Sequence, residues 1–114
     1  MEFGETSEFA HDLKRLRKKY LSLDEDVTAL REAIEVSPSG DGAKHCNCMR
    51  RAGDVIVYKI RLACRYLQAS RMRVIYAHHV KERKVVFIEL YYKGEHVHED
   101  GGRITAYLKS NMLQ

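Results

Sequence analysis

The chain has 114 residues, of which 45% are hydrophobic and 32% charged, and its 20 Lys and Arg exceed its 16 Asp and Glu by four. This composition supports one folded domain, over residues 1–114, and excludes a disordered chain. The longest apolar run, residues 85–88, is far shorter than the ~20 residues of a membrane helix, and the acidic start is unlike a secretory signal, so we expect a soluble, cytoplasmic protein without membrane partners.

After a short extended segment at residues 2–5, the spacing of four apolar side chains predicts a helix with one buried stripe, which consists of Phe9, Leu13, Leu16 and Tyr20. Thr6 or Ser7 is suited to cap its start. The other faces are basic and include Lys14 and Lys18. These cations form either a solvated face or a contact surface for nucleic acid.

A second helix is predicted to start at Leu23, because Ser22 and Glu25 have the spacing of a capping box. Its apolar side consists of Leu23, Val27, Leu30 and Ile34. The short connection to the first helix predicts an antiparallel helical hairpin. Proline and glycine in residues 37–42 predict a turn that ends this helical half.

After this turn, the spacing of apolar residues changes from that of helices to the two-residue alternation of strands. Residues 55–65 alternate between apolar and basic, and residues 72–78 and 84–92 are rich in β-branched and aromatic side chains. With a turn at residues 81–83, these runs predict an antiparallel meander, and residues 43–50 predict a weaker strand. Ile104, Tyr107 and Leu108 predict a short C-terminal helix. The fold class is therefore α+β, with the helical hairpin on one face of a small antiparallel sheet and the opposite face open for function.

The three cysteines are an odd number, which favours free thiols in a reducing compartment. Cys46 and Cys48 follow His45 and could form part of a metal site, but no second pair at ligand spacing follows them. We therefore expect neither a metal nor another cofactor.

Positive charge is concentrated in residues 44–93, where twelve Lys and Arg face three acids, a net charge of +9. Strand alternation predicts that the side chains on the open face are Lys59, Arg61 and Arg65, then Arg71 and Arg73, and finally Glu89, Tyr91 and Lys93, opposite Val86, Ile88, Leu90 and Tyr92. Edge charges that discourage aggregation are one explanation. Phosphate recognition explains the arginines better, because a guanidinium binds phosphate through two hydrogen bonds.

The order of these motifs resembles the RelE/ParE superfamily of bacterial and archaeal toxins from type II toxin–antitoxin modules. The residues that carry the resemblance are the helical stripe, then Tyr58-Lys59-Ile60-Arg61, Arg73-Val74-Ile75-Tyr76 and Phe87-Ile88-Glu89-Leu90-Tyr91-Tyr92-Lys93. The resemblance covers almost the whole chain. It implies a ribosome-dependent endoribonuclease that cuts mRNA without a metal and is held inactive by an antitoxin.

The resemblance also implies roles for single residues. Arg61, Arg73 and Lys93 would stabilise the scissile phosphate, and Lys59 would serve as base. Relatives often have a tyrosine or histidine after the last strand as acid or base, and here the candidates are Tyr91, His96 and His98. The remaining candidates for RNA contact are Arg65, Arg71, Lys14 and Lys18.

Two other functions stay open at this stage. Gyrase-poisoning members of the superfamily share its fold but lack the basic catalytic set, so this chain could be a non-enzymatic inhibitor. A plain nucleic-acid-binding module would show steep salt dependence without cleavage. The expected partners of the toxin are ribosome, mRNA and an acidic, partly disordered antitoxin that folds on binding.

Overall fold

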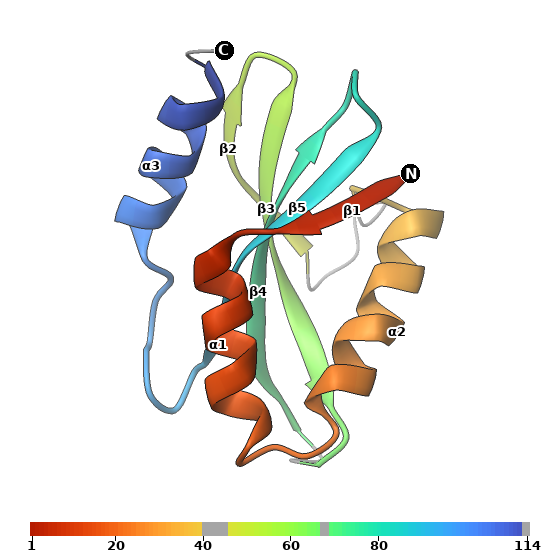
Figure 1. Ribbon diagram of the computed structural model, residues 1–114, viewed down its shortest axis with the longest axis vertical. Helices are drawn as coiled ribbons and strands as arrows, with labels where there is room; N and C mark the ends of the chain where they lie inside the picture. The colour runs from red at the N-terminus through yellow and green to blue at the C-terminus, as the bar shows by residue number, and fades with distance from the viewer. Residues whose placement is uncertain (40–45, 67–68, 113–114) are drawn as a thin grey trace.

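The computed structural model describes residues 1–39, 46–66 and 69–112. Along the chain they form β1 (Glu2–Glu5), α1 (Ser7–Arg17), α2 (Leu23–Val36), β2 (Cys46–Ala52), β3 (Val55–Cys64), β4 (Ala69–His79), β5 (Lys84–Tyr92) and α3 (Gly101–Met112) (Figure 1). The α+β prediction is confirmed. The predicted turn at residues 37–42, the weak strand at 43–50 and His45 lie partly or wholly outside the described residues. Within the described ranges, no helix is long and apolar enough to cross a membrane.

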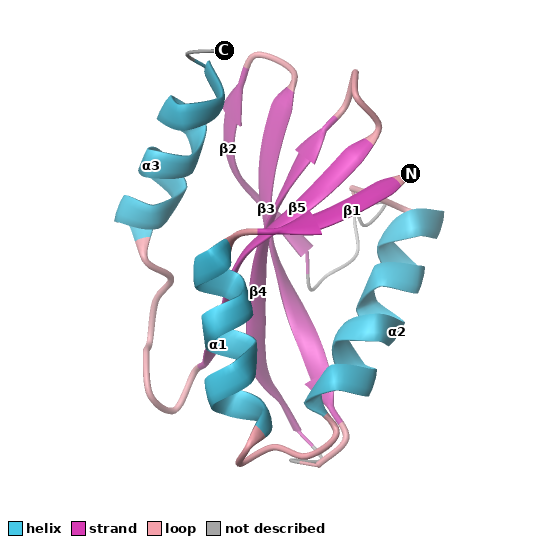
Figure 2. Cartoon of the chain, in the orientation of Figure 1, coloured by secondary structure: helices cyan, strands magenta, loops and turns pink. Residues whose placement is uncertain are grey.

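The strands form one sheet in the order β1-β5-β4-β3-β2. The predicted meander of β3, β4 and β5 is antiparallel, and β2 extends it antiparallel to β3. The sheet is not wholly antiparallel, because β1 pairs parallel to β5. This pairing places the N-terminal strand at one edge and leads the chain directly into α1 (Figure 2).

The predicted start of α1 is confirmed in detail. The Thr6 hydroxyl accepts a hydrogen bond from the Phe9 backbone N–H at 3.1 Å, which satisfies one of the unpaired donors of the first turn. The helix ends at Arg17, three residues before the last member of the predicted stripe. Tyr20 is nevertheless buried, because its side chain belongs to the same core as the rest of the stripe.

The predicted capping box at the start of α2 is wrong. Ser22 has helical backbone angles, and its hydroxyl donates to the Asp26 carboxylate at 2.7 Å instead of capping the helix. The same hydroxyl accepts from the Tyr66 backbone N–H at 2.9 Å. Ser22 therefore ties the turn between the two helices to the turn after β3.

The sheet has an apolar core on each face. The larger core lies beneath α1 and α2, and its members include Phe9, Leu30, Met72, Tyr76 and Phe87. The smaller one lies beneath α3 and consists of Val55, Val57, Ile75, Ala77, Ile88, Tyr91, Ile104 and Leu108. The expectation of a fully open second face is therefore wrong. The tail forms a helix whose Ile104 and Leu108 pack against this face.

Because of a β-bulge, the side chains of β5 are distributed over the two faces of the sheet differently from the prediction. Ile75 pairs with Glu89 and Tyr76 pairs with Phe87, so Ile88 is an extra residue in the strand. Ile88 belongs to the core beneath α3, together with Ile75, and not to the hairpin side. The prediction is right for Leu90 and Tyr92, which pack on the hairpin side. It is wrong for Ile88 and for Val86, which is directly opposite Ala77 of the core beneath α3, because the extra residue shifts the alternation between the two halves of the strand.

Candidate nucleic-acid interface

Three predicted site residues lie side by side across three strands. Arg61 of β3 is directly opposite Arg73 of β4, and Arg73 is directly opposite Tyr91 of β5. Directly opposite residues in a sheet have neighbouring Cβ atoms about 4.5–5.5 Å apart. The row therefore places two guanidinium groups and a phenol side by side on the second face, where Arg61 is exposed and Arg73 and Tyr91 are buried.

Two arginines in directly opposite positions repel each other. Arg73 is 9% exposed, and one of its guanidinium nitrogens donates to the Met72 carbonyl at 3.0 Å. Burial lowers the pKa of Arg73, and the neighbouring Arg61 and Arg71 lower it further. An arginine stays protonated under these conditions, so the pair concentrates positive charge. Two adjacent guanidinium groups suit an anionic ligand such as phosphate.

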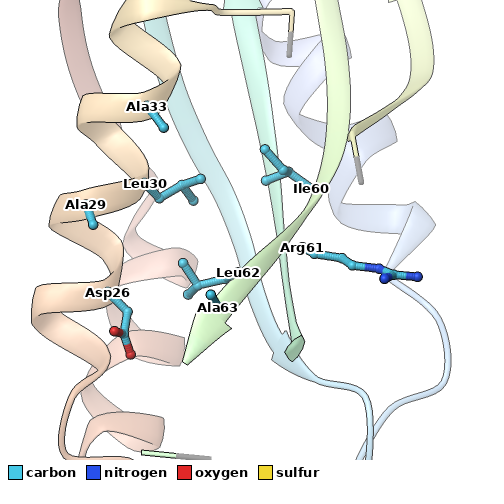
Figure 3. A pocket seen from close by; sticks show the side chains of 8 residues that line it. All are labelled: Asp26, Ala29, Leu30, Ala33, Ile60, Arg61, Leu62 and Ala63. Atoms are coloured by element: carbon cyan, nitrogen blue, oxygen red, sulfur yellow. The ribbon is translucent and has the colours of Figure 1, made fainter. Parts of the chain in front are cut away.

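The alternation of β3 separates this charge from an apolar groove on the opposite side. Figure 3 shows Ile60 and Leu62 on the side of α2, whereas Arg61 points away from that helix. The groove, about 360 Å³, lies between α2 and β3 and includes Ala29 and Ala33 in its lining. The predicted two-faced character of this strand is confirmed at these positions.

Lys59 lies on the same side of β3 as Arg61 but is engaged by a carboxylate. Its ammonium donates to Glu99 at 2.9 Å, and both side chains are largely buried. Burial alone would raise the pKa of Glu99, but hydrogen bonds from Lys59 and from backbone outweigh it and the pKa is lowered. Glu99 is therefore a carboxylate at neutral pH. Glu99 forms an ion pair with Lys59, the lysine that the sequence analysis assigned as base. A phosphate can therefore bind Lys59 only if it displaces Glu99.

Replacing Glu99 by glutamine is expected to tighten polyanion binding roughly two- to five-fold, the range of a partly exposed ion pair. The amide keeps the size of the side chain but removes the negative charge that competes for Lys59. Fluorescence anisotropy with a labelled single-stranded oligonucleotide measures the change. Glu82→Gln, an exposed position in the β4–β5 turn, is the matched control for net charge. Equal tightening by both variants, or none by Glu99→Gln, contradicts the competition.

The next row carries two further predicted cations. Lys93 follows β5, and its backbone N–H donates to the Arg71 carbonyl at 2.8 Å. Both side chains are exposed, and the Arg71 guanidinium lies 5.8 Å from the centre of the Tyr92 ring. Arg71 and Lys93 thus extend the positive surface from the Arg61–Arg73 row toward the end of the sheet. We call Lys59, Arg61, Arg71, Arg73 and Lys93 the basic cluster.

The acid or base candidates differ in environment. Tyr91 is 2% exposed, and burial, with Glu99 and Glu89 nearby, raises its pKa to about 12. It therefore holds its proton at neutral pH and can only donate. His96 and His98 are exposed in the segment between β5 and α3. This segment begins beside Lys93 and reaches Glu99 at Lys59, so it borders the basic cluster.

Three predicted contact residues lie outside the cluster. Arg65 follows the end of β3 and forms ion pairs with Glu25 and Asp26 at the start of α2. Its predicted place on the open face is wrong, because the register of β3 shifts after Leu62 and the strand ends at Cys64. Lys14 and Lys18 are exposed on α1, where they line a groove of about 310 Å³ with His11 and Arg15.

Sequence reasoning missed the ionic contact that holds α3 in place. Arg103 of α3 donates two hydrogen bonds, of 2.7 and 3.1 Å, to the Asp12 carboxylate of α1. Asp12 also accepts a hydrogen bond from the Leu90 backbone N–H at 3.1 Å. Arg103 donates to the Ile88 carbonyl as well, at 3.1 Å, where the bulge lies. Asp12 thus joins α1, β5 and α3. In the sequence, Asp12 is one acid near five Lys and Arg, and this pattern gives no indication of its role.

A second contact fixes the start of α3. The Asp100 carboxylate accepts from the backbone N–H groups of Gly102 and Arg103, at 3.0 and 3.3 Å, and so caps the helix that the two glycines begin. The Asp100 N–H donates to Glu89 at 2.9 Å. An aspartate directly before two glycines is a typical N-cap, so Asp100 is the residue from which the start of this helix could have been predicted.

Glu89→Gln is expected to stabilise the fold near neutral pH. Burial raises the pKa of Glu89, which is 6% exposed, and its acidic neighbours Asp12 and Asp100 contribute. The pKa of this carboxyl is higher in the folded state than in the unfolded state, where it is about 4.3. Its protonation therefore favours folding at pH values below about 4.3, and this stabilisation is lost as the pH rises through the folded pKa. Glutamine still accepts the Asp100 hydrogen bond. Melting temperatures from pH 4 to 8 should show an advantage of the variant that grows with pH, and a constant or negative difference contradicts this assignment.

Of the cysteines considered as thiols or metal ligands, Cys46 and Cys48 lie on β2 at the edge of the sheet. All three cysteines are free, and Cys46 is near the Tyr76 hydroxyl, with its sulfur at 3.6 Å. Burial raises the pKa of the Cys46 thiol, which makes it a weak nucleophile at neutral pH. Among the described residues, no three His, Cys, Asp or Glu side chains converge as a metal site.

Comparison with known proteins supports the fold through structure rather than sequence. No family model and no curated protein matches the chain. The structure is similar to the archaeal RelE–RelB complex from Pyrococcus horikoshii, with a TM-score of 0.60 and 19% sequence identity over 82% of this chain and 94% of that one. At this identity the likeness concerns the fold. The hairpin, the meander and this structural match together show that the chain has the α+β fold of RelE-like toxins.

Proposed function

We propose that this chain is the toxin of a type II toxin–antitoxin module and that it cuts mRNA in the ribosome without a metal ion. The observation that carries the proposal is the Arg61–Arg73–Tyr91 row, in register across three strands. The row belongs to a sheet with the RelE-like fold, and Arg61 is its exposed member. Lys59 and Lys93 add positive charge beside this row.

The basic cluster suits cleavage by the RNA's own 2′-hydroxyl. The 2′-oxygen attacks the adjacent phosphorus, the bond from phosphorus to the 5′-oxygen breaks, and the product is a 2′,3′-cyclic phosphate with a free 5′-hydroxyl. Negative charge builds up on the phosphorane oxygens in between. Arg61, Arg73 and Lys93 are proposed to bind these oxygens, because fixed cations stabilise developing charge most.

Proton transfer needs a base for the 2′-hydroxyl and an acid for the 5′-oxygen. Tyr91 is a candidate acid, since its raised pKa keeps the phenol protonated. His96 or His98 is a candidate for the second group, because histidine is the side chain that most often transfers protons in catalysis. Lys59 remains a candidate base once its ion pair with Glu99 is broken.

The proposed protein partner is an acidic antitoxin. The RelE protein that this structure resembles is described in complex with RelB. In the present chain the basic cluster lies across β3 from the apolar groove beside α2. A partly disordered acidic chain that folds on binding would cover the charge with acids and the groove with apolar side chains.

The test uses purified protein and ribosomes that hold a defined mRNA codon in the A site. Primer extension should reveal cleavage within that codon, and naked mRNA should be cut much more slowly. Intact mRNA together with stimulated gyrase-dependent DNA breaks would identify an inhibitor of gyrase instead. Salt-sensitive RNA binding without any cleavage would identify a binding module.

A further inference from the structure

A neutral amide lies beside the basic cluster on the second face of the sheet. Asn47 of β2 is directly opposite Lys59 of β3, so the two side chains leave the sheet on the same side. Arg61 follows Lys59 on that side and is therefore the diagonal neighbour of Asn47. The alternation of β2 agrees with this placement, because Cys46 packs on the other side, against the core beneath the helical hairpin. Asn47 and Arg61 are both exposed.

The Asn47 side chain is available to a ligand. Within residues 1–39, 46–66 and 69–112, no group forms a hydrogen bond with its amide. Asparagine is also unfavourable in strands, because its short polar side chain packs little surface and competes for backbone hydrogen bonds. Since β2 is an edge strand, a ligand can approach Asn47 from beside the sheet as well as from above it. An exposed amide at such a position suits recognition better than folding.

The charges around Asn47 favour a base at this position over a phosphate. The Lys59 ammonium beside it is neutralised by the Glu99 carboxylate at 2.9 Å. Arg61, by contrast, has no carboxylate at ion-pair distance in the part of the chain that the structure describes. A phosphate is therefore bound at Arg61 in preference to Lys59. Diagonal neighbours in a sheet have Cβ atoms about 7–8 Å apart, which is similar to the span from a phosphate to the base of the same nucleotide.

The chemistry of an amide selects among the bases. The Asn47 side chain presents an N–H donor and a carbonyl acceptor side by side in one plane. Asparagine typically forms two hydrogen bonds with adenine, because adenine shows an acceptor, N7, beside a donor, the N6 amino group. Guanine shows two acceptors, N7 and O6, on the same edge. These edges are accessible in the unpaired bases of single-stranded RNA, so the amide favours adenine.

We propose that Asn47 determines base specificity, in that it binds the base of the nucleotide whose phosphate lies at Arg61 and favours adenine there. This contact rests on the proposed function for its place beside the cleaved bond. It adds sequence preference to a site whose basic cluster contacts only phosphate. Two hydrogen bonds between an amide and a base typically favour the matching base by roughly 5- to 150-fold.

The experiment compares two labelled RNA homo-oligomers of equal length and charge. One consists of adenosine, and the other consists of purine riboside, which lacks only the N6 amino group. Both are titrated with the full chain at moderate salt, with fluorescence anisotropy as the readout. The wild type should bind the adenosine oligomer roughly two- to ten-fold more tightly, which is the usual net effect of one hydrogen bond. Asn47→Ala should bind both oligomers with equal affinity.

Cys48→Ala is the matched control and should keep the preference, because Cys48 is the next residue of β2 and is exposed but lies opposite Tyr58 on the hairpin side. Equal wild-type affinity for both oligomers would overturn the contact, and so would an undiminished preference in Asn47→Ala. The readout is independent of catalysis. An adenine preference without any mRNA cleavage would refute the proposed nuclease and keep the contact, whereas cleavage without an adenine preference would do the reverse.

Discussion

Replacing Arg61 by alanine is expected to slow mRNA cleavage on the ribosome by about 10²–10³-fold, the usual effect of removing one group that stabilises a developing negative charge. Arg61 is exposed and directly opposite Arg73, so its removal takes away a cation without opening the core. The loss should fall mainly on kcat, because the phosphorane carries more charge than the bound phosphodiester. Single-turnover cleavage rates at saturating ribosome complex measure it.

Lys81→Ala is the control for this result. Lys81 is an exposed cation in the β4–β5 turn, outside the basic cluster, and its removal changes the net charge by the same amount. The control variant should cleave within about two-fold of the wild type, because surface charges away from a site act mainly through screened attraction. Equal losses in both variants would mean that general charge, and not the Arg61–Arg73 row, carries the activity.

Asp12→Ala is expected to lower the free energy of unfolding by about 3–5 kcal/mol, as is typical when one partner of a buried ion pair is removed. Asp12 is 6% exposed and accepts three hydrogen bonds, two from Arg103 and one from the Leu90 backbone. Without it, the partly buried Arg103 loses its principal carboxylate and the Leu90 N–H loses its acceptor. Urea denaturation followed by circular dichroism measures the change.

Glu8→Gln is the matched variant for the same arginine. The Glu8 carboxylate lies 3.5 Å from Arg103, but its side chain is 60% exposed, so we expect a loss below about 1 kcal/mol. The contrast between the two acids separates a buried contact from a surface one. Similar losses for both variants would show that burial does not distinguish the two contacts, and a loss below about 1 kcal/mol for Asp12→Ala would show that the Asp12–Arg103 contact contributes little to stability.

Local patterns were sufficient to predict most of the fold. Thr6 caps α1 as its position suggested, and β1 and β5 have the predicted bounds. Alternation in β3 correctly placed Arg61 apart from Ile60 and Leu62, because a strand that is regular over this stretch turns successive side chains to opposite faces. The row of Arg61 and Arg73 could be inferred for the same reason.

The errors arise at irregularities of the strands and at contacts between segments far apart in the sequence. The bulge at Ile88 restarts the alternation of β5, and nothing in the apolar run of that strand marks the extra residue. Arg65 turns toward α2 because the strand has already ended. The ion pairs of Asp12 with Arg103 and of Lys59 with Glu99 join residues 91 and 40 positions apart, which no spacing rule connects.

The chemical identity of the cut RNA ends tests the central claim most directly. Attack by the 2′-hydroxyl, stabilised by the basic cluster alone, leaves a 2′,3′-cyclic phosphate or its hydrolysis product, a 3′-phosphate, on one fragment and a 5′-hydroxyl on the other. Mass spectrometry of fragments from ribosome-bound mRNA reads both ends. We predict a 5′-hydroxyl with a cyclic or 3′-phosphate. A 5′-phosphate with a 3′-hydroxyl, or uncut mRNA, would contradict the proposed chemistry.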